Sequence, residues 1–170
     1  MNKESILKQI IEERRSIYPK SYTQKEISSS VLEEVILSAN FAPNHKKTKP
    51  WRFKLISGDE KDILSSEIQK LYKEQTPEAL FLQKKYEDFA IKMKQTTAII
   101  PIVVNYSGLV PQWEEIAAVS MAVQNMYLTC TAHGLGCYWS SHPIFHHLSQ
   151  YLELDENQQC LGLFYIGSID

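Results

Sequence analysis

The chain has 170 residues, of which 44% are hydrophobic and 22% charged, and this composition favours one packed domain over residues 1–170. Its 18 Lys and Arg residues against 20 Asp and Glu residues give a formal net charge of -2. No overall positive field is therefore available to gather nucleic acid or an anionic membrane surface, and any anion-binding site must be local.

The cysteines and the apolar segments bear on the cellular compartment. Cys130, Cys137 and Cys160 form no CxxC pair and leave one odd thiol, which argues against a secreted disulfide framework and favours a reducing cytoplasm. The N-terminus has no export-signal pattern. The most apolar window, residues 116–132, is shorter than the roughly 20 residues needed to cross a bilayer. We therefore expect a cytoplasmic protein with no membrane or nucleic-acid partner.

The N-terminal part predicts two amphipathic helices. Apolar residues recur at helical spacing through residues 6–11, so a first helix is expected to end at about Arg14 or Arg15. The same spacing returns in residues 31–39, and this second helix is expected to stop near Pro43.

A half-buried strand and a charged helical segment follow. Apolar and basic residues alternate through residues 51–55, as they do in a strand with one buried face. Residues 60–94 are charged and helical in character, with a break at Thr76 and Pro77. There we expect the threonine to cap a further helix and the proline to occupy its first position.

The next two elements are a buried strand and a long helix. Residues 97–106 are almost continuously apolar, although Pro101 indicates an edge or a bulge. Residues 112–133 predict one helix that is apolar on nearly all faces and that ends at Gly134. Such a helix is buried either by the sheet and a second subunit or wholly within its own domain.

The C-terminal part completes an α+β pattern. It contains a strand or loop at residues 138–141, a short helix at 144–152 and a closing strand at 160–166. Because helices and strands interleave without a regular βαβ rhythm, we expect an α+β fold with a mixed central sheet flanked by helices.

The segment Arg14-Arg15-Ser16 lies at the expected end of the first helix. Two guanidinium groups and a hydroxyl suit the phosphate and polyol of a nucleotide. A solvated basic helix end that pairs with Glu12 or Glu13 is the alternative.

A series of short motifs resembles the nitroreductase family of FMN enzymes, and in particular its small, single-domain NAD(P)H branch. In chain order these motifs are Arg14-Arg15-Ser16, a helix ending in Ala42-Pro43, the loop that closes with Pro50-Trp51-Arg52-Phe53, the run Ala122 to Met126, the run Gly134 to Trp139, and the terminal Leu163 to Gly167. Each motif is degenerate, whereas their common order and spacing over nearly the whole chain are specific.

The resemblance implies a homodimer with two FMN sites at the subunit interface, the long helix contributing to that interface. It implies that NADH or NADPH reduces the bound FMN by hydride transfer, and that the reduced flavin then reduces a nitro compound, quinone or similar small-molecule acceptor. A non-catalytic flavin-binding protein for storage, sensing or regulation is the alternative. The implied flavin contacts are Arg14, Arg15 and Ser16, then Phe41 and His45 from the other subunit, then Trp139, Ser140 and Ser141.

This chain departs from the family pattern at two places. His45, Lys47 and Lys49 stand where larger relatives often carry Ser, Asn and Gln. Lys47 is a candidate to stabilise negative charge near the flavin N1/O2 edge. The chain also ends in Ile169-Asp170 without the basic residue that many relatives place after the last strand, so the N-terminal arginines are expected to do more of the phosphate binding.

A zinc site is the remaining chemical alternative. His142, His146 and His147 follow Cys137, but no CxxC or HExxH pattern supports metal binding. We therefore expect no metal, a helix that starts at His142-Pro143 with His146 and His147 at its surface, and a packing role for Cys137. The acidic pair Glu114 and Glu115 is expected to complement the positive end of the long helix.

Overall fold

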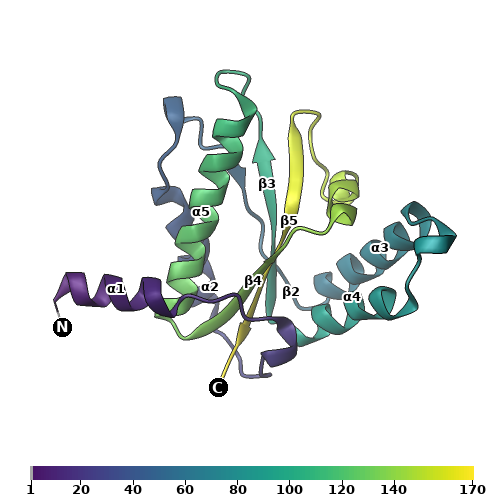
Figure 1. Cartoon of the computed structure of the whole chain (residues 1–170), viewed down its shortest axis with the longest axis horizontal. Coiled ribbons are helices and arrows are strands. Elements are labelled where there is room, and N and C mark those ends of the chain that lie inside the picture. Colours follow the sequence, from purple (N-terminus) through teal and green to yellow (C-terminus); the bar gives the residue numbers. More distant parts are fainter. Residues whose placement is uncertain (1) are drawn as a thin grey trace.

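The computed structural model describes residues 2–170 and is drawn in Figure 1. Its α-helices are α1 (Lys3–Glu13), α2 (Ser29–Ser38), α3 (Glu60–Gln75), α4 (Gln83–Gln95) and α5 (Gln112–Ala132). Its strands are β1 (Trp51–Arg52), β2 (Ile56–Ser57), β3 (Ala98–Asn105), β4 (Leu135–Ser140) and β5 (Gln158–Ser168). Short 3-10 turns are η1 (Pro19–Ser21), η2 (Ala39–Phe41), η3 (His45–Lys47), η4 (Glu78–Leu80) and η5 (Pro143–Ser149).

The strands form one antiparallel sheet in the order β1-β3-β5-β4, with β2 also paired to β3. The α+β class is confirmed, but the expected mixed sheet is wrong for the described residues. Strands β3 and β4, which α5 connects, do run in the same direction. The closing strand β5 lies between them and pairs antiparallel with both, so the two parallel strands never become neighbours.

Pro101 marks an interruption in the ladder of a central strand. Of the expected strand at residues 51–55, only residues 51–52 form one, β1, and a second short strand, β2, follows at Ile56–Ser57. The two strands pair with β3 on either side of Pro101. Proline has no N–H to give to a ladder, and pairing on this side of β3 is interrupted opposite it. The register with β5 shifts between Ile102 and Val103, so a bulge does lie close by.

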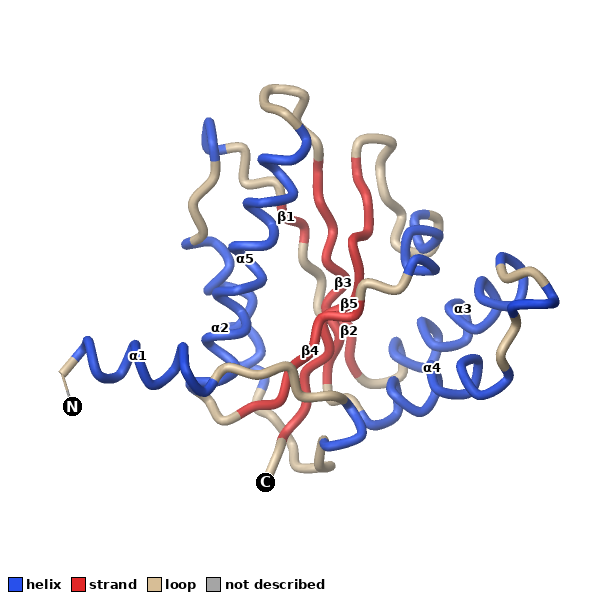
Figure 2. Tube along the Cα trace, viewed as in Figure 1, coloured by secondary structure: helices blue, strands red, loops and turns tan. Residues whose placement is uncertain are grey.

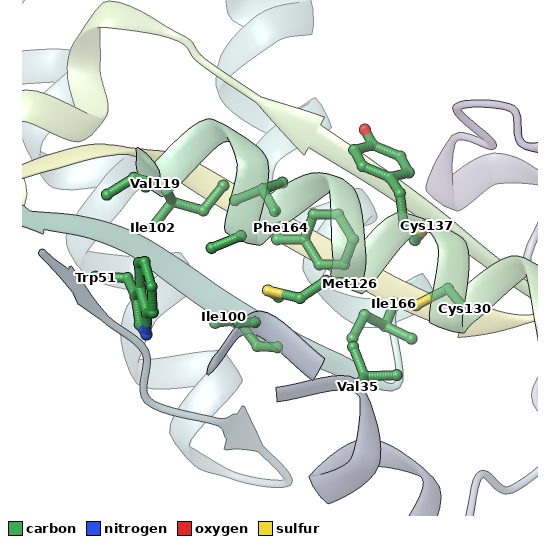
Figure 3. Packing of buried hydrophobic residues seen from close by; sticks show 14 of the residues in the cluster. Val35, Trp51, Ile100, Ile102, Val119, Met126, Cys130, Cys137, Phe164 and Ile166 are labelled. Atoms are coloured by element: carbon green, nitrogen blue, oxygen red, sulfur yellow. The ribbon is translucent and has the colours of Figure 1, made fainter. Parts of the chain in front are cut away.

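Helices cover both faces of the sheet, with α2 and α5 on one and α3, α4 and η5 on the other (Figure 2). Alternate residues of β3 serve the two layers: Ile100 and Ile102 face α5, whereas Ile99 and Val103 face α3 and η5. Figure 3 shows the first layer, in which Val35, Met126 and Phe164 are among the fully buried side chains.

The break at Thr76 and Pro77 is where the sequence places it, but its details differ. Thr76 is the C-cap of α3, and Pro77 precedes the 3-10 turn η4. The next α-helix begins only at Gln83. The expected cap and first helical position at Thr76 and Pro77 are therefore wrong, because a turn intervenes between the two helices.

Two helices keep apolar surface uncovered. No residue of α1 is buried, and this helix projects from the body of the molecule (Figure 1). The sheet buries one side of α5, while Trp113 and Met121 on its other side are 69% and 40% exposed. The chain alone thus covers only part of the long apolar helix. Within residues 2–170, no helix has both the length and the apolar character needed to span a membrane.

Candidate functional site

Arg14, Ser16 and Trp139 meet at the side chain of Tyr127, near the C-terminal end of α5. The Ser16 hydroxyl lies 3.3 Å from the Tyr127 hydroxyl, and the Trp139 backbone N–H donates to that same oxygen at 2.8 Å. The Arg14 guanidinium carbon lies 5.4 Å from the Tyr127 ring centroid, which is a cation–π distance. We call these four residues the Tyr127 cluster.

Tyr127 was not identified from the sequence. It occupies one of many large apolar positions along α5, and only the chain reversal that brings β4 back beside α5 reveals its polar contacts. Burial raises the pKa of Tyr127, and this outweighs the opposite effect of its bonds with Ser16 and Trp139. The hydroxyl therefore keeps its proton at neutral pH.

The segment after Ser16 is fastened to the edge of the sheet. The Ile17 N–H donates to the carbonyl of Cys137 at 2.9 Å, and the Tyr22 hydroxyl donates to the carbonyl of Ile17 at 2.8 Å. The Tyr22 ring lies over Gly136 and Gly167, where a Cβ on Gly167 would come within 2.2 Å of a ring carbon. These paired glycines leave room for the ring and so fix the chain that carries Arg14 and Ser16.

The two adjacent arginines have different surroundings. The Arg15 guanidinium donates to the carbonyls of Glu12 and Arg14, at 2.7 and 2.8 Å, and so satisfies acceptors at the C-terminal end of α1. Arg14 is half-buried and makes no ion pair within residues 2–170. Its guanidinium remains available for an anion, and the alternative pairing with Glu12 or Glu13 is not observed for either arginine in this part of the chain.

Trp139 has a buried donor without an acceptor. Its indole N–H has no hydrogen-bond partner in the described part of the chain. The indole lies against Gly162, where an added Cβ would come within 2.5 Å of the indole nitrogen and 2.3 Å of the Ser140 carbonyl oxygen. Ser140 itself is buried, whereas Ser141 is exposed at the end of β4. A buried N–H that its own chain leaves unpaired is unusual, and this one is open to an acceptor from outside the chain.

His45 and the basic loop, residues 44–49, lie at the other end of α5, whereas Phe41 belongs to η2, which packs on α5. Phe41 is 85% exposed, and Lys47 is exposed on the basic loop. The His45 Nδ1 lies 2.6 Å from a carboxylate oxygen of Glu114, in the first turn of α5. A cavity of about 310 Å³ adjoins this pair, and its lining includes Trp113.

The basic loop has an uncommon backbone. Lys46, Lys47 and Lys49 all have positive φ, at 51°, 56° and 44°, a region that L-residues with long side chains rarely adopt. The Lys46 ammonium group donates to the carbonyl of Leu109, which ties the loop to the segment before α5. Backbone strain of this kind is often kept where a loop contacts a ligand.

One copy of the chain does not bring the two groups together. Glu114 and Tyr127 lie about 20 Å apart along α5, at roughly 1.5 Å of rise per residue. The Tyr127 cluster and the basic loop of one subunit are therefore well separated along α5.

The acidic residues that open α5 do more than complement its dipole. Both carboxylate oxygens of buried Glu115 accept the N–H of Ser107, at 3.1 and 3.2 Å, and Glu114 holds His45. The two carboxylates thus fix the loops on either side of the helix start.

The histidines considered for a zinc site lie beside an aromatic ring or at the surface. The His142 ring lies edge-on to Phe89 at 5.6 Å, and burial lowers its pKa. His146 and His147 are exposed. Over residues 2–170, no three metal-ligating side chains gather into a group.

Cys137 packs in the core, as the sequence predicts. Its exposure is 1%, and a hydrogen bond between Cys137 and Cys130 raises the pKa of Cys130, with burial acting in the same direction. The Cys130 thiol therefore stays protonated and unreactive at neutral pH.

Comparison with known proteins identifies the family. A family model described as "Nitroreductase family" matches residues 11–168. The chain is 26% identical over 174 residues to the Bacillus subtilis protein named "Putative NAD(P)H nitroreductase YfhC", covering 100% of this chain and 88% of that one. The fold matches a nitroreductase-like family protein from Bacillus cereus with a TM-score of 0.83 and 27% identity, over 100% of this chain and 88% of the other.

A second solved structure shows that the same fold persists at low identity. It is the FMN-dependent nitroreductase NfnB from Mycobacterium smegmatis in complex with NADPH, with a TM-score of 0.79 and 15% identity, over 99% of this chain and 90% of the other. The family match covers almost all of the described residues, including both groups at the ends of α5. The chain belongs to the nitroreductase family.

Proposed function

We propose that this protein is a homodimeric, FMN-dependent oxidoreductase that takes hydride from NADH or NADPH and passes it to a nitro compound, quinone or similar acceptor. Family membership supports the reaction class. The observation that carries the cofactor assignment is that the Tyr127 cluster contains Arg14, which makes no ion pair within residues 2–170, and Trp139, whose buried indole N–H has no acceptor in that part of the chain.

The Tyr127 cluster fits the phosphate and polyol of FMN. Arg14 offers a planar set of donors suited to phosphate, and Ser16 offers a hydroxyl beside it. The Trp139 indole N–H would find its acceptor on the same ligand, and Ser140 and Ser141 continue the edge of the sheet beside it. Arg15, which already binds carbonyls of its own helix, is assigned a smaller part.

A second copy of the chain would cover the exposed apolar surface. Helix α1 has 11 residues and buries none of them, and helices this short are marginal in water unless they pack on something. Its Leu7 is 55% exposed, and Trp113 of α5 and Leu37 of α2 are 69% and 58% exposed on the same side of the sheet. Apolar surface spread over three helices supports a dimer interface that includes α5.

The dimer would complete the site. Its two-fold axis would place the basic loop of one subunit against the Tyr127 cluster of the other, which resolves the separation of about 20 Å along α5. Phe41, His45 and Lys47 would then approach the flavin held by the first subunit.

When bound, FMN would supply the hydride transfer itself. The chain's own residues would bind and orient the cofactor: Arg14 and Ser16 at the phosphate end, and Lys47 as a positive charge at the pyrimidine edge. Glu114 fixes the orientation of the His45 ring, which would lie beside that edge. All three cysteines are free and buried, which supports a reducing compartment such as the cytoplasm.

Anaerobic reduction tests this function directly. The purified protein, loaded with FMN, is expected to lose its visible flavin absorbance when NADH or NADPH is added, and to regain it when a quinone follows. Stable yellow protein that neither nucleotide bleaches would contradict the oxidoreductase proposal and favour a non-catalytic flavin-binding protein. Colourless protein that takes up no FMN would contradict both.

A further inference from the structure

We infer that Tyr127 is a positioning residue that directs the Ser16 hydroxyl proton toward the phosphate of FMN. This inference rests on the proposed function and deepens it, because it names the group that makes the site prefer a phosphorylated flavin. Tyr127 would not touch the cofactor; it would act through Ser16 and Arg14.

The outer edge of β4 provides the first hydrogen bonds of this arrangement. The Cys137 carbonyl on this edge receives the N–H of Ile17, and two residues later the Trp139 N–H points to the same side. No further strand pairs with this side of β4 in residues 2–170. The Tyr127 oxygen, reaching in from α5, takes the Trp139 N–H and occupies the place of a neighbouring strand's carbonyl.

The available protons determine which group donates in each hydrogen bond from Trp139 through Tyr127 to Ser16. With its oxygen already accepting from Trp139, the Tyr127 hydroxyl has its own proton to place, and the Ser16 oxygen lies 3.3 Å away. If Tyr127 donates to Ser16, the Ser16 proton is free to point outward to an anion. Each bond in such a chain polarises the next, which strengthens the terminal donor.

The ring of Tyr127 also helps to position a phosphate donor, through its contact with Arg14. The Arg14 guanidinium lies over it at 5.4 Å, so one side chain holds both donors of the phosphate site. Phenylalanine would keep this ring and lose only the hydroxyl. The two contributions of Tyr127 can therefore be separated by a single substitution.

The test compares Tyr127→Phe with wild-type protein for two ligands, FMN and riboflavin, which lacks the phosphate. Dissociation constants are measured from the quenching of flavin fluorescence. A hydrogen bond to a charged group is worth roughly a factor of ten in affinity, so we expect the Kd for FMN to rise about tenfold. The Kd for riboflavin should change less than about twofold, because the ring and ribityl contacts remain.

Tyr106→Phe is the matched control. The Tyr106 hydroxyl donates to a Gln159 side-chain oxygen at 2.7 Å, away from the Tyr127 cluster, so this variant also loses one partly buried hydroxyl. It should bind both flavins as the wild type does. Far-UV circular dichroism of both variants checks that the fold is kept.

A second variant, Ser16→Ala, tests whether Tyr127 acts on FMN binding through Ser16. If Tyr127 acts through Ser16, Ser16→Ala and Tyr127→Phe should each weaken FMN binding, and the double variant should be little worse than Ser16→Ala alone. Additive losses, or equal losses for FMN and riboflavin, would overturn the inference, since Tyr127 would then only shape the pocket. Wild-type protein that binds neither flavin would overturn the proposed function itself, and is distinguished before any variant is compared.

Discussion

Met121→Glu is expected to convert the dimer to monomers and to weaken FMN binding at least about a hundredfold. Met121 is 40% exposed on the side of α5 that the sheet leaves uncovered, beside the cavity at His45 and Glu114. A carboxylate buried there without a partner costs several kcal/mol, about 3 to 5 when a charge is left unpaired. Because each flavin would lie between two subunits, losing the dimer should also lose the site.

The measurement combines light scattering, for the molecular mass, with FMN titration of the same sample. Ile63→Glu is the matched control: Ile63 is 59% exposed on α3, which covers the opposite face of the sheet. That variant should remain dimeric and yellow. A monomeric Met121→Glu protein that binds FMN as tightly as the wild type would show that one subunit holds the whole site.

Arg14→Ala should raise the Kd for FMN between about tenfold and a hundredfold and leave riboflavin binding nearly unchanged. The reason is that the proposed charge-assisted contact between the Arg14 guanidinium and the phosphate would be lost. Dissociation constants for the two flavins, measured side by side, check this expectation.

Arg15→Ala is the natural comparison for this variant. Its guanidinium already donates to two carbonyls at the end of α1, so its loss should change the Kd for FMN by less than about threefold. If Arg15→Ala weakens FMN more than Arg14→Ala does, the assignment of the phosphate to Arg14 is wrong.

Local patterns predicted most of the secondary structure. The helical spacing before Arg14, the apolar run of β3 and the closing strand β5 all lie where the sequence places them, because each shows in a local run of residues as a helical period or a continuous apolar stretch. The pairing of the strands could not be predicted from these local patterns. That β5 inserts between β3 and β4, and that the ladder is interrupted opposite Pro101, are consequences of contacts between segments far apart in the chain.

Some residues of the candidate site could likewise be predicted from local sequence, and others could not. The order of short motifs predicted the family and led to Arg14 and Ser16. Tyr127 could not be found, because nothing in an apolar helix marks the one hydroxyl that will meet the edge of a sheet. The different roles of Arg14 and Arg15 depend on how α1 ends, which adjacent identical residues cannot reveal.

A mixed dimer tests most directly whether two subunits share each flavin site. Arg14→Ala damages the Tyr127 cluster and Phe41→Ala the opposite group, so a dimer with one variant subunit of each kind should contain one site with both defects and one intact site. Differently tagged copies, co-expressed and purified through both tags, should bind one FMN per dimer with wild-type affinity, while each variant homodimer binds weakly. Mixed dimers that bind FMN no better than the two variant homodimers would contradict the shared site.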